Sequence, residues 1–190
     1  LIRRKDDSQP AARLAINDAV ESVFTALEGE RLAQLSAPLV SAKRVWVLSG
    51  ETSRAGAHAL HSGLSMIRPG VRALEEHSLG TELSDAGKDD TAVIFDFFRY
   101  RRQVANAARV FSESGATVVA ITDSPLSPLV ELADQWCEIE VPAVGPFDSS
   151  VPAVTVAELL VSRVARDLQD DATARIDHIE DLWEKTEVFL

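Results

Sequence analysis

Four apolar runs of strand length alternate with helical patterns along this chain of 190 residues. They are RVWVLS (44–49), TAVIFDF (91–97), TVVAIT (117–122) and WCEIEV (136–141), and a shorter run lies within RPGVRALE (68–75). Strands that are almost continuously apolar are typical of a parallel sheet that is buried on both faces, with helices in the crossovers. The sequence therefore predicts an α/β fold, a three-layer α/β/α sandwich around a five-stranded parallel sheet.

Helical periodicity fills the segments around these runs. It predicts helices over residues 11–28, 30–42, 54–67, 81–87, 100–114, 127–134, 151–169 and 172–188. In the segment 54–67, Ala57, Leu60, Leu64 and Ile67 share one face of the helix. The first two and the last two helices are additions that flank the sandwich at either end of the chain.

The composition limits the class of protein. With 46% hydrophobic residues the chain can bury one sizeable core, and no apolar run approaches the roughly 20 residues of a membrane span. A single cysteine, Cys137, and a polar N-terminal segment favour a cytoplasmic protein. The net charge of −11 argues against nucleic-acid binding by this piece itself. Because the first residue is Leu and not Met, we expect the chain to be part of a longer protein.

Ligands of open parallel sheets bind beyond the carboxyl ends of the strands, at the point where the strand order reverses. That rule selects four loops, which are residues 49–54, 96–102, 122–127 and 145–151. Each loop carries hydroxyl, acidic or basic side chains. We therefore look for binding residues in these loops.

Four segments carry a resemblance to a known family. They are VWVLSGETSRAGAHALHSGLSMIRPGVRAL, VIFDFFRYRRQV, GATVVAITDSPLSPLVELADQ and FDSSVPAVTVAELLVSRVA. They resemble the sugar isomerase (SIS) domain and, more narrowly, the ligand-sensing half of RpiR-type bacterial transcriptional regulators. The resemblance implies the flavodoxin-like strand order 2-1-3-4-5. It also implies that residues 1–42 are connector helices, that residues 43–190 form the effector-binding domain, and that a DNA-binding helix-turn-helix domain precedes them.

The loop after the first strand holds Ser49, Gly50, Thr52 and Ser53 as candidate ligand contacts. Members of the family often show a Gly-x-Gly-x-Ser pattern here, in which main-chain N–H groups bind a phosphate at the start of a helix. In this chain Ser49 and Glu51 stand where the two glycines would be. Thr52 and Ser53 still offer hydroxyl and N–H groups, and the alternative for Ser53 is a plain helix cap.

The loop after the third strand, FDFFRYRRQ, departs further from the family pattern. Arg99 is the candidate in this loop, because a guanidinium binds carboxylate or phosphate in a two-pronged geometry. Arg101 and Arg102 are interpreted as the solvated first turn of a helix. Asp96 and Glu51 flank the same pocket, where we expect them to accept hydrogen bonds from ligand hydroxyls.

The last two loops add Thr122, Ser149 and Ser150, which can contact an anion or cap a helix. We therefore expect a small anion at the carboxyl ends of the first and third strands. It touches Ser53 and Arg99, and Ser149 or Ser150 closes the site.

The sequence contains no recognisable catalytic or metal-binding constellation. His58 and His61 have no acidic or thiol partner at ligand spacing, and Glu75, Glu76 and His77 do not identify a catalytic base. We therefore expect no cofactor, no metal and no enzyme activity. Two functions remain open, the effector-sensing and oligomerising domain of a transcription regulator or a free-standing SIS-type phosphosugar isomerase.

The expected partners are a small anionic metabolite, either a sugar phosphate or a sugar acid, and a second copy of the chain. The segment ARIDHIEDLWEKTEVFL places Ile176, Ile179 and Trp183 on one stripe, which either the chain's own core or a partner copy covers. The resemblance favours a homodimer. DNA would be bound only through the missing N-terminal domain, and we expect no contact with a membrane.

Overall fold

A five-stranded sheet forms the centre of the computed structural model, which describes residues 8–74 and 79–189. Its strands are β1 (Arg44–Ser49), β2 (Val71–Ala73), β3 (Asp90–Phe95), β4 (Thr117–Thr122) and β5 (Gln135–Glu138). They lie in the order β2-β1-β3-β4-β5, and all neighbours are parallel. The predicted fold class and strand order are confirmed. Strands β1 and β3 lie side by side where the order reverses.

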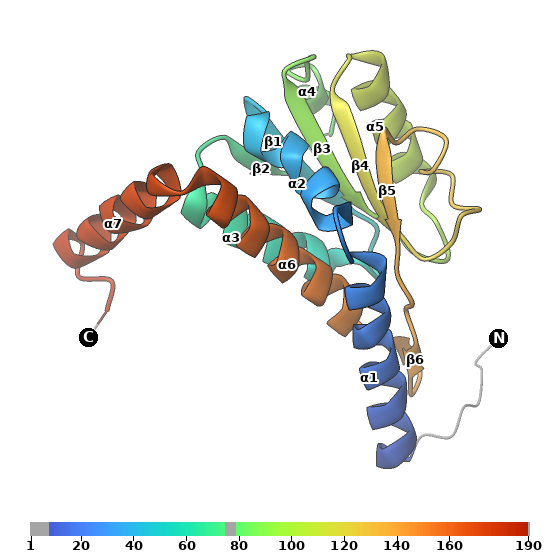
Figure 1. The fold of residues 1–190 in the computed structure, drawn as a ribbon. Coiled ribbons are helices and arrows are strands. Elements are labelled where there is room, and N and C mark those ends of the chain that lie inside the picture. The colour runs from blue at the N-terminus through green and yellow to red at the C-terminus, as the bar shows by residue number, and fades with distance from the viewer. Residues whose placement is uncertain (1–7, 75–78, 190) are drawn as a thin grey trace.

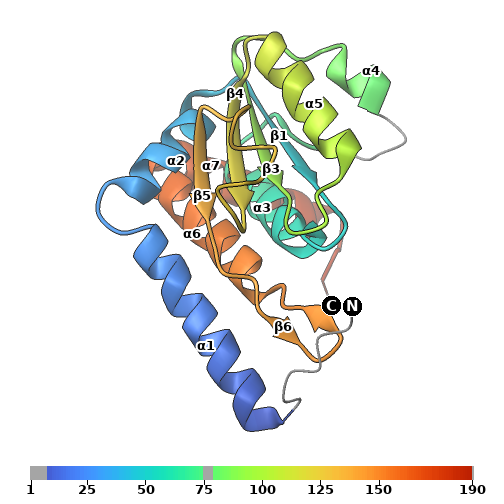
Figure 2. The same cartoon turned by 90° about the vertical axis from the view of Figure 1, so that its right-hand side faces the viewer.

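Helices cover both faces of this sheet (Figures 1 and 2). They are α1 (Gln9–Ala26), α2 (Arg31–Ser41), α3 (Arg54–Ile67), α4 (Leu79–Leu83), α5 (Arg102–Glu113), α6 (Val151–Leu168) and α7 (Asp170–Lys185). Side chains of α1, α2, α3 and α6 enclose one core with one face of the sheet, and α5 encloses a second core on the other face. In the described ranges, no helix is both long and apolar enough to cross a membrane.

Alternate residues of each strand contribute to the two cores. In β1, Val45 and Val47 belong to the core of α3 and α6, whereas Trp46 and Leu48 belong to the core of α5. The rings of Trp46 and Phe111 of α5 lie 6.0 Å apart between centroids. Because both faces of the strand are buried, its four central positions are apolar, which explains the apolar run of the sequence.

Two glycines allow α3 to pack closely on α6. A Cβ atom at Gly56 would lie 2.7 Å from the Cβ of Ala153 and 2.9 Å from its carbonyl oxygen. A Cβ atom at Gly63 would lie 2.7 Å from a methyl group of Val161. The close packing of α3 on α6 fixes the position of the first turn of α3, which lies at the carboxyl end of β1.

The helix predicted over residues 127–134 is wrong. The segment forms successive turns instead, with a main-chain hydrogen bond from Val130 N to Ser127 O. The fully buried Leu129 holds the segment against the core of α5. Packing of one side chain therefore replaces the regular helix that the pattern suggested.

A hairpin of β6 (Ala143–Val144) and β7 (Phe147–Asp148) was not predicted. It turns at Gly145, whose φ of 62° lies in the left-handed region that favours glycine. Its strands are two residues long and show no apolar alternation, so the sequence offered no strand signal. The acidic and histidine cluster at residues 75–77 lies outside the described residues.

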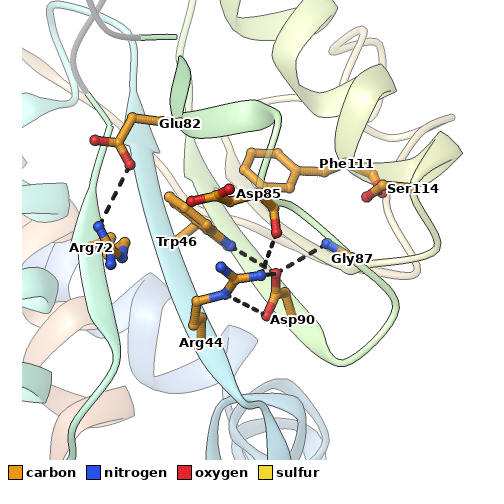
Figure 3. Close-up of polar contacts among 9 residues, drawn as sticks. All are labelled: Arg44, Trp46, Arg72, Glu82, Asp85, Gly87, Asp90, Phe111 and Ser114. Atoms are coloured by element: carbon orange, nitrogen blue, oxygen red, sulfur yellow. Dashed lines mark hydrogen bonds and ion pairs between the residues drawn. The ribbon is translucent and has the colours of Figure 1, made fainter. Parts of the chain in front are cut away.

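A network around Asp90, the first residue of β3, holds the amino edge of the sheet (Figure 3). Its carboxylate accepts hydrogen bonds from Arg44 Nε at 3.0 Å, Trp46 Nε1 at 3.2 Å and Gly87 N at 3.1 Å. Burial alone would raise the pKa of Asp90, but the hydrogen bonds from Arg44 and Trp46 hold it below its ordinary value. Asp90 is therefore a structural anchor at the edge opposite to the predicted ligand site.

Helix α7 extends away from the rest of the molecule (Figure 1). Gln169, between α6 and α7, has a left-handed φ of 49° at this break. Ile176 packs on the helical core, whereas Leu182 and Phe189 farther along are 45% and 71% exposed. Of the predicted stripe, Ile179 and Trp183 are half-buried and lie outside the two cores.

Candidate functional site

The loop after β1 closes directly onto β3. Gly50 is buried, and its N–H donates to Phe95 O at 2.9 Å. A Cβ atom at Gly50 would lie 2.2 Å from Oδ1 of Asp96, so a larger residue would displace that carboxylate. The glycine therefore makes room for an acidic side chain of the neighbouring loop.

Ser53 and Thr122 are buried at this edge and have a different role from the expected ligand contact. Ser53 Oγ donates to Phe95 O at 2.7 Å, and Thr122 Oγ1 donates to Asp96 O at 2.9 Å. Ser53 makes no side-chain capping hydrogen bond to α3 either. A hydroxyl has one proton to donate, so both side chains hold the loops together and their protons are not offered to a ligand.

Asp96 follows β3 and is only 1% exposed. One carboxylate oxygen, Oδ2, accepts a hydrogen bond from Arg101 N at 3.0 Å, immediately before α5 begins. Burial raises the pKa of Asp96 to about 6, and the nearby carboxylate of Asp123 contributes in the same direction. The expected hydrogen bonds from Asp96 to ligand hydroxyls are wrong for this structure, because the side chain does not reach the surface.

Asp123 braces the same loop from the side of β4. Its carboxylate accepts hydrogen bonds from Phe98 N at 2.9 Å and from Tyr100 Oη at 2.8 Å. Burial and this hydrogen bond to Asp123 raise the pKa of Tyr100 to about 12. Arg99 lies between the two bonded residues, is exposed, and has a φ of 78°. The loop thus holds a non-glycine residue in the left-handed region with its side chain near solvent.

The loops after β1 and β3 are also joined by an ion pair between Glu51 and Arg101. Both side chains are partly exposed, so the pair contributes little to stability. Arg102 is exposed and begins α5. The interpretation of a solvated first turn therefore fits Arg102, whereas Arg101 links two loops.

The remaining predicted contacts lie nearer to solvent than Ser53 and Thr122. Thr52 and Ser150 are exposed, and Ser49 and Ser149 are half-buried. Ser149 Oγ accepts a hydrogen bond from Val151 N at 3.3 Å, in the first turn of α6. These four hydroxyl groups are therefore more accessible to a ligand than those of Ser53 and Thr122.

A family model for the SIS domain matches residues 38–163, about two thirds of the chain. The chain belongs to the SIS domain family. Its fold is similar to the sugar isomerase domain of an RpiR transcription factor from Sphaerobacter thermophilus, with 24% identity and a TM-score of 0.81 over 91% of this chain and 99% of that one. A search of curated protein sequences found no significant match.

Two further solved structures have the same fold. The NanR protein of Vibrio vulnificus, complexed with ManNAc-6P, is 17% identical, with a TM-score of 0.75 over 93% of this chain and 69% of that one. A protein of Methanococcus jannaschii, whose structure was used to infer a 3-hexulose-6-phosphate isomerase function, is 14% identical, with a TM-score of 0.72 over 88% and 96%. SIS neighbours thus include both a regulator and an inferred enzyme.

Asp123 and Tyr100 brace the candidate site, and sequence reasoning did not assign them to it. Asp123 directly follows β4, and an acidic residue at the carboxyl end of a strand is a signal that could have been used. No local pattern around Tyr100 indicated its role, because its hydrogen-bond partner, Asp123, is distant in sequence. Their pairing became visible only with the loop geometry.

Other parts of the described chain offer less for ligand chemistry. Across residues 8–74 and 79–189, no three His, Cys, Asp or Glu side chains are grouped so that they could hold a metal ion. His58 is exposed, and burial lowers the pKa of His61, with a further contribution from His58.

A hollow of about 600 Å³ lies at the end of α7, lined by Glu180, Trp183, Glu184, Glu187 and Phe189. It is not at the carboxyl edge of the sheet, and part of its lining is the apolar stripe of α7.

Proposed function

We propose that this SIS domain is the ligand-sensing and oligomerising part of an RpiR-type transcriptional regulator. It binds a small anionic metabolite, a sugar phosphate or a sugar acid, and controls DNA binding by a helix-turn-helix domain that precedes residues 1–42. The similarity to the RpiR factor of S. thermophilus and to NanR, which is complexed with ManNAc-6P, supports this proposal. The observation that carries it is the braced conformation of Arg99.

Arg99 stands between residues whose positions are fixed by hydrogen bonds to Asp123 and Asp96. Its left-handed conformation costs roughly 1–2 kcal/mol for a residue with a Cβ atom. Strain that the surrounding structure maintains is concentrated at functional sites. A side chain on a backbone held in this way loses less freedom on binding, which favours recognition of an anion by Arg99.

The anion lies between Arg99 and the start of α3. The first N–H groups of a helix lack helical acceptors and carry partial positive charge. The turn from Gly50 to Thr52 leads into α3, so an anion beside this turn lies near the first N–H groups of that helix. Ser49, Ser149 and Ser150 supply hydroxyl groups for the polar part of the ligand. The hydroxyl groups of Ser53 and Thr122 are left out of this surface, because they are donated within the fold.

A phosphosugar isomerase is the second candidate, because one SIS neighbour has such an inferred function. An isomerase needs a base within hydrogen-bond reach of the substrate carbon. Among the carboxylates that the structure describes at this edge, Asp96 is buried, Asp123 already accepts two hydrogen bonds, and Glu51 pairs with Arg101. Each of these three carboxylates is already buried or paired, which disfavours its use as the base.

The test is a thermal-shift screen with ManNAc-6P, glucose 6-phosphate and gluconate, followed by calorimetry with the probes that stabilise the protein. A charged contact is worth about 1.5–3 kcal/mol, so Arg99→Ala should weaken binding roughly 10- to 150-fold. Arg102→Ala is the matched control and should change the affinity little. Equal losses at both positions would contradict the assigned site, and conversion of a sugar phosphate to its isomer, followed by NMR, would establish the enzyme alternative.

We also propose that the chain works as a homodimer in the cytoplasm. Leu182 adds an exposed apolar side chain to the helix that bears Ile176, Ile179 and Trp183, and the exposed Phe189 follows the end of this helix, which leaves the body of the molecule. A partner copy would cover this apolar surface. The aromatic rings of Trp183 and Phe189 pack edge to face with centroids 5.4 Å apart, which gives the surface a defined shape.

A further inference from the structure

Asp96 occupies a position in which an anion would be expected to bind. One of its carboxylate oxygens accepts the N–H of Arg101 directly before α5, and the other lies against Gly50 in the loop after β1. The start of a helix favours negative charge, and β1 and β3 are the strands at which the sheet order reverses. The chain's own carboxylate therefore fills the start of α5 and lies beneath the surface that we assign to the ligand.

We propose that Asp96 determines the charge of the ligand that this SIS domain accepts, by opposing dianions such as phosphate esters and admitting monoanions such as sugar acids. This inference rests on the proposed function, because it assumes an anion at the carboxyl ends of β1 and β3. The repulsion between two charges is proportional to each charge, so a dianion is opposed twice as strongly as a monoanion at the same place. Burial of Asp96 keeps water and salt from screening this repulsion.

Asp96 is distinguished from the other carboxylates of this edge that the structure describes. Glu51 is 62% exposed at its side chain and pairs with Arg101, and Asp148 is exposed. Asp123 is half-buried and accepts hydrogen bonds from two groups of the loop. Only the charge of Asp96 is both fully buried and placed between the two loops, so we assign the selectivity to this residue.

The selectivity depends on pH. Burial raises the pKa of Asp96 to about 6, and the charged or titratable groups that surround it are Asp123, Tyr100, Arg101 and Glu51. A bound dianion raises the pKa of Asp96 further, so dianion affinity is highest when Asp96 is protonated and falls as the pH rises above about 6. A further rise of one pKa unit corresponds to about a tenfold loss of affinity.

The test compares glucose 6-phosphate with glucose 6-sulfate, whose single charge does not change with pH. Dissociation constants are measured by calorimetry near pH 5 and pH 8 for the wild type, Asp96→Asn and the charge control Asp148→Asn. We expect Asp96→Asn to bind the phosphate ester about tenfold more tightly than the wild type near pH 8, and the sulfate ester about threefold more tightly. Because the phosphate ester itself titrates near pH 6, the pH profile of Asp96→Asn is the baseline for the wild type.

The outcomes separate the two proposals. Equal affinities of wild type and Asp96→Asn for the phosphate ester near pH 8 would overturn the role of Asp96 and leave the ligand site intact. Failure of both proteins to bind either probe at any pH would overturn the site and the inference together. If Asp96→Asn does not fold, Asp96→Ser, which also removes the charge, replaces it in the same comparison. A gain in affinity that is larger for the phosphate ester than for the sulfate ester supports the inference, and equal gains with both esters overturn it.

Discussion

Asp96 and Asp123 hold the loop after β3 from two sides, and their hydrogen bonds fix the residues on either side of Arg99. Each carboxylate has lost part of its hydration, and Asp96 has lost nearly all of it. An ionised carboxylate in such a place reduces the stability of the fold, because burial disfavours the charged form. At the scale of single residues, the carboxylate that holds the loop after β3 therefore lowers the free energy of unfolding.

The free energy of unfolding should reveal this effect of Asp96. Its pKa is about 6 in the fold and 3.8 ordinarily, so the folded state binds more protons than the unfolded state between these values. The contribution of Asp96 to the free energy of unfolding is greatest below about pH 4. It falls by at most about 3 kcal/mol as the pH rises through 6. Asp96→Asn should therefore be more stable than the wild type by about 1–3 kcal/mol at neutral pH and nearly equal to it near pH 4.

Urea denaturation at both pH values measures this difference. Other groups titrate in the same range, so the informative quantity is the difference between variant and wild type at each pH. A difference that does not change with pH would show that the Asp96 carboxylate is not disfavoured by burial.

Among the elements, the packing of α3 on α6 places the turn that follows β1. Gly56→Ala would bring a Cβ atom to 2.7 Å from Ala153, so the helices must move apart. We expect a loss of about 1–3 kcal/mol in the free energy of unfolding. Gly80→Ala in α4 is the control, because a Cβ there meets nothing within 4 Å and should be neutral or slightly stabilising.

Thermal and urea denaturation of the two glycine variants provide the measurement. Similar stabilities of Gly56→Ala and Gly80→Ala would mean that α3 and α6 tolerate a wider spacing. In that case the position of the first turn of α3 would not depend on this close contact.

Elements with a strong local pattern could be predicted from the sequence. The bounds of β1 and α3 agree with the predicted 44–49 and 54–67, because both have a clear period and are stabilised by burial. The segment 127–134 could not be predicted, since the burial of Leu129 against the core of α5 holds turns in place of a helix of similar pattern. A local helical pattern does not indicate whether tertiary packing of the same residues favours another conformation.

The candidate site was predicted at the level of loops and not of atoms. Three of the four predicted loops, 49–54, 96–102 and 122–127, directly follow β1, β3 and β4 at the carboxyl edge, whereas residues 145–151 include β7 and do not directly follow β5. The sequence could not indicate that Ser53 and Thr122 would be buried, because their acceptors, Phe95 O and Asp96 O, are main-chain atoms distant in sequence. The burial of Asp96 depends in turn on the absence of a side chain at Gly50.

At the scale of the whole molecule, α7 extends from the body and bears Leu182 and Trp183 near its end, and Phe189 follows the end of this helix. We expect light scattering to give the mass of a dimer at tens of micromolar. Leu182→Asp places a charge on the apolar surface and should give a monomer without unfolding the domain, because this side chain is 45% exposed. Glu180→Gln, on the same helix, should remain a dimer, and a wild-type monomer at this concentration would contradict the proposal.

The central claim is that a small anion binds at the carboxyl ends of β1 and β3. The most direct test is a titration of the isotopically labelled chain with inorganic phosphate and then with ManNAc-6P, followed by amide NMR shifts. We expect the largest changes in residues 50–54 and 98–101, with smaller changes at Ser149 and Ser150. Changes concentrated instead at the amino edge, around Ser41 and Lys88, or along α7 would contradict the account.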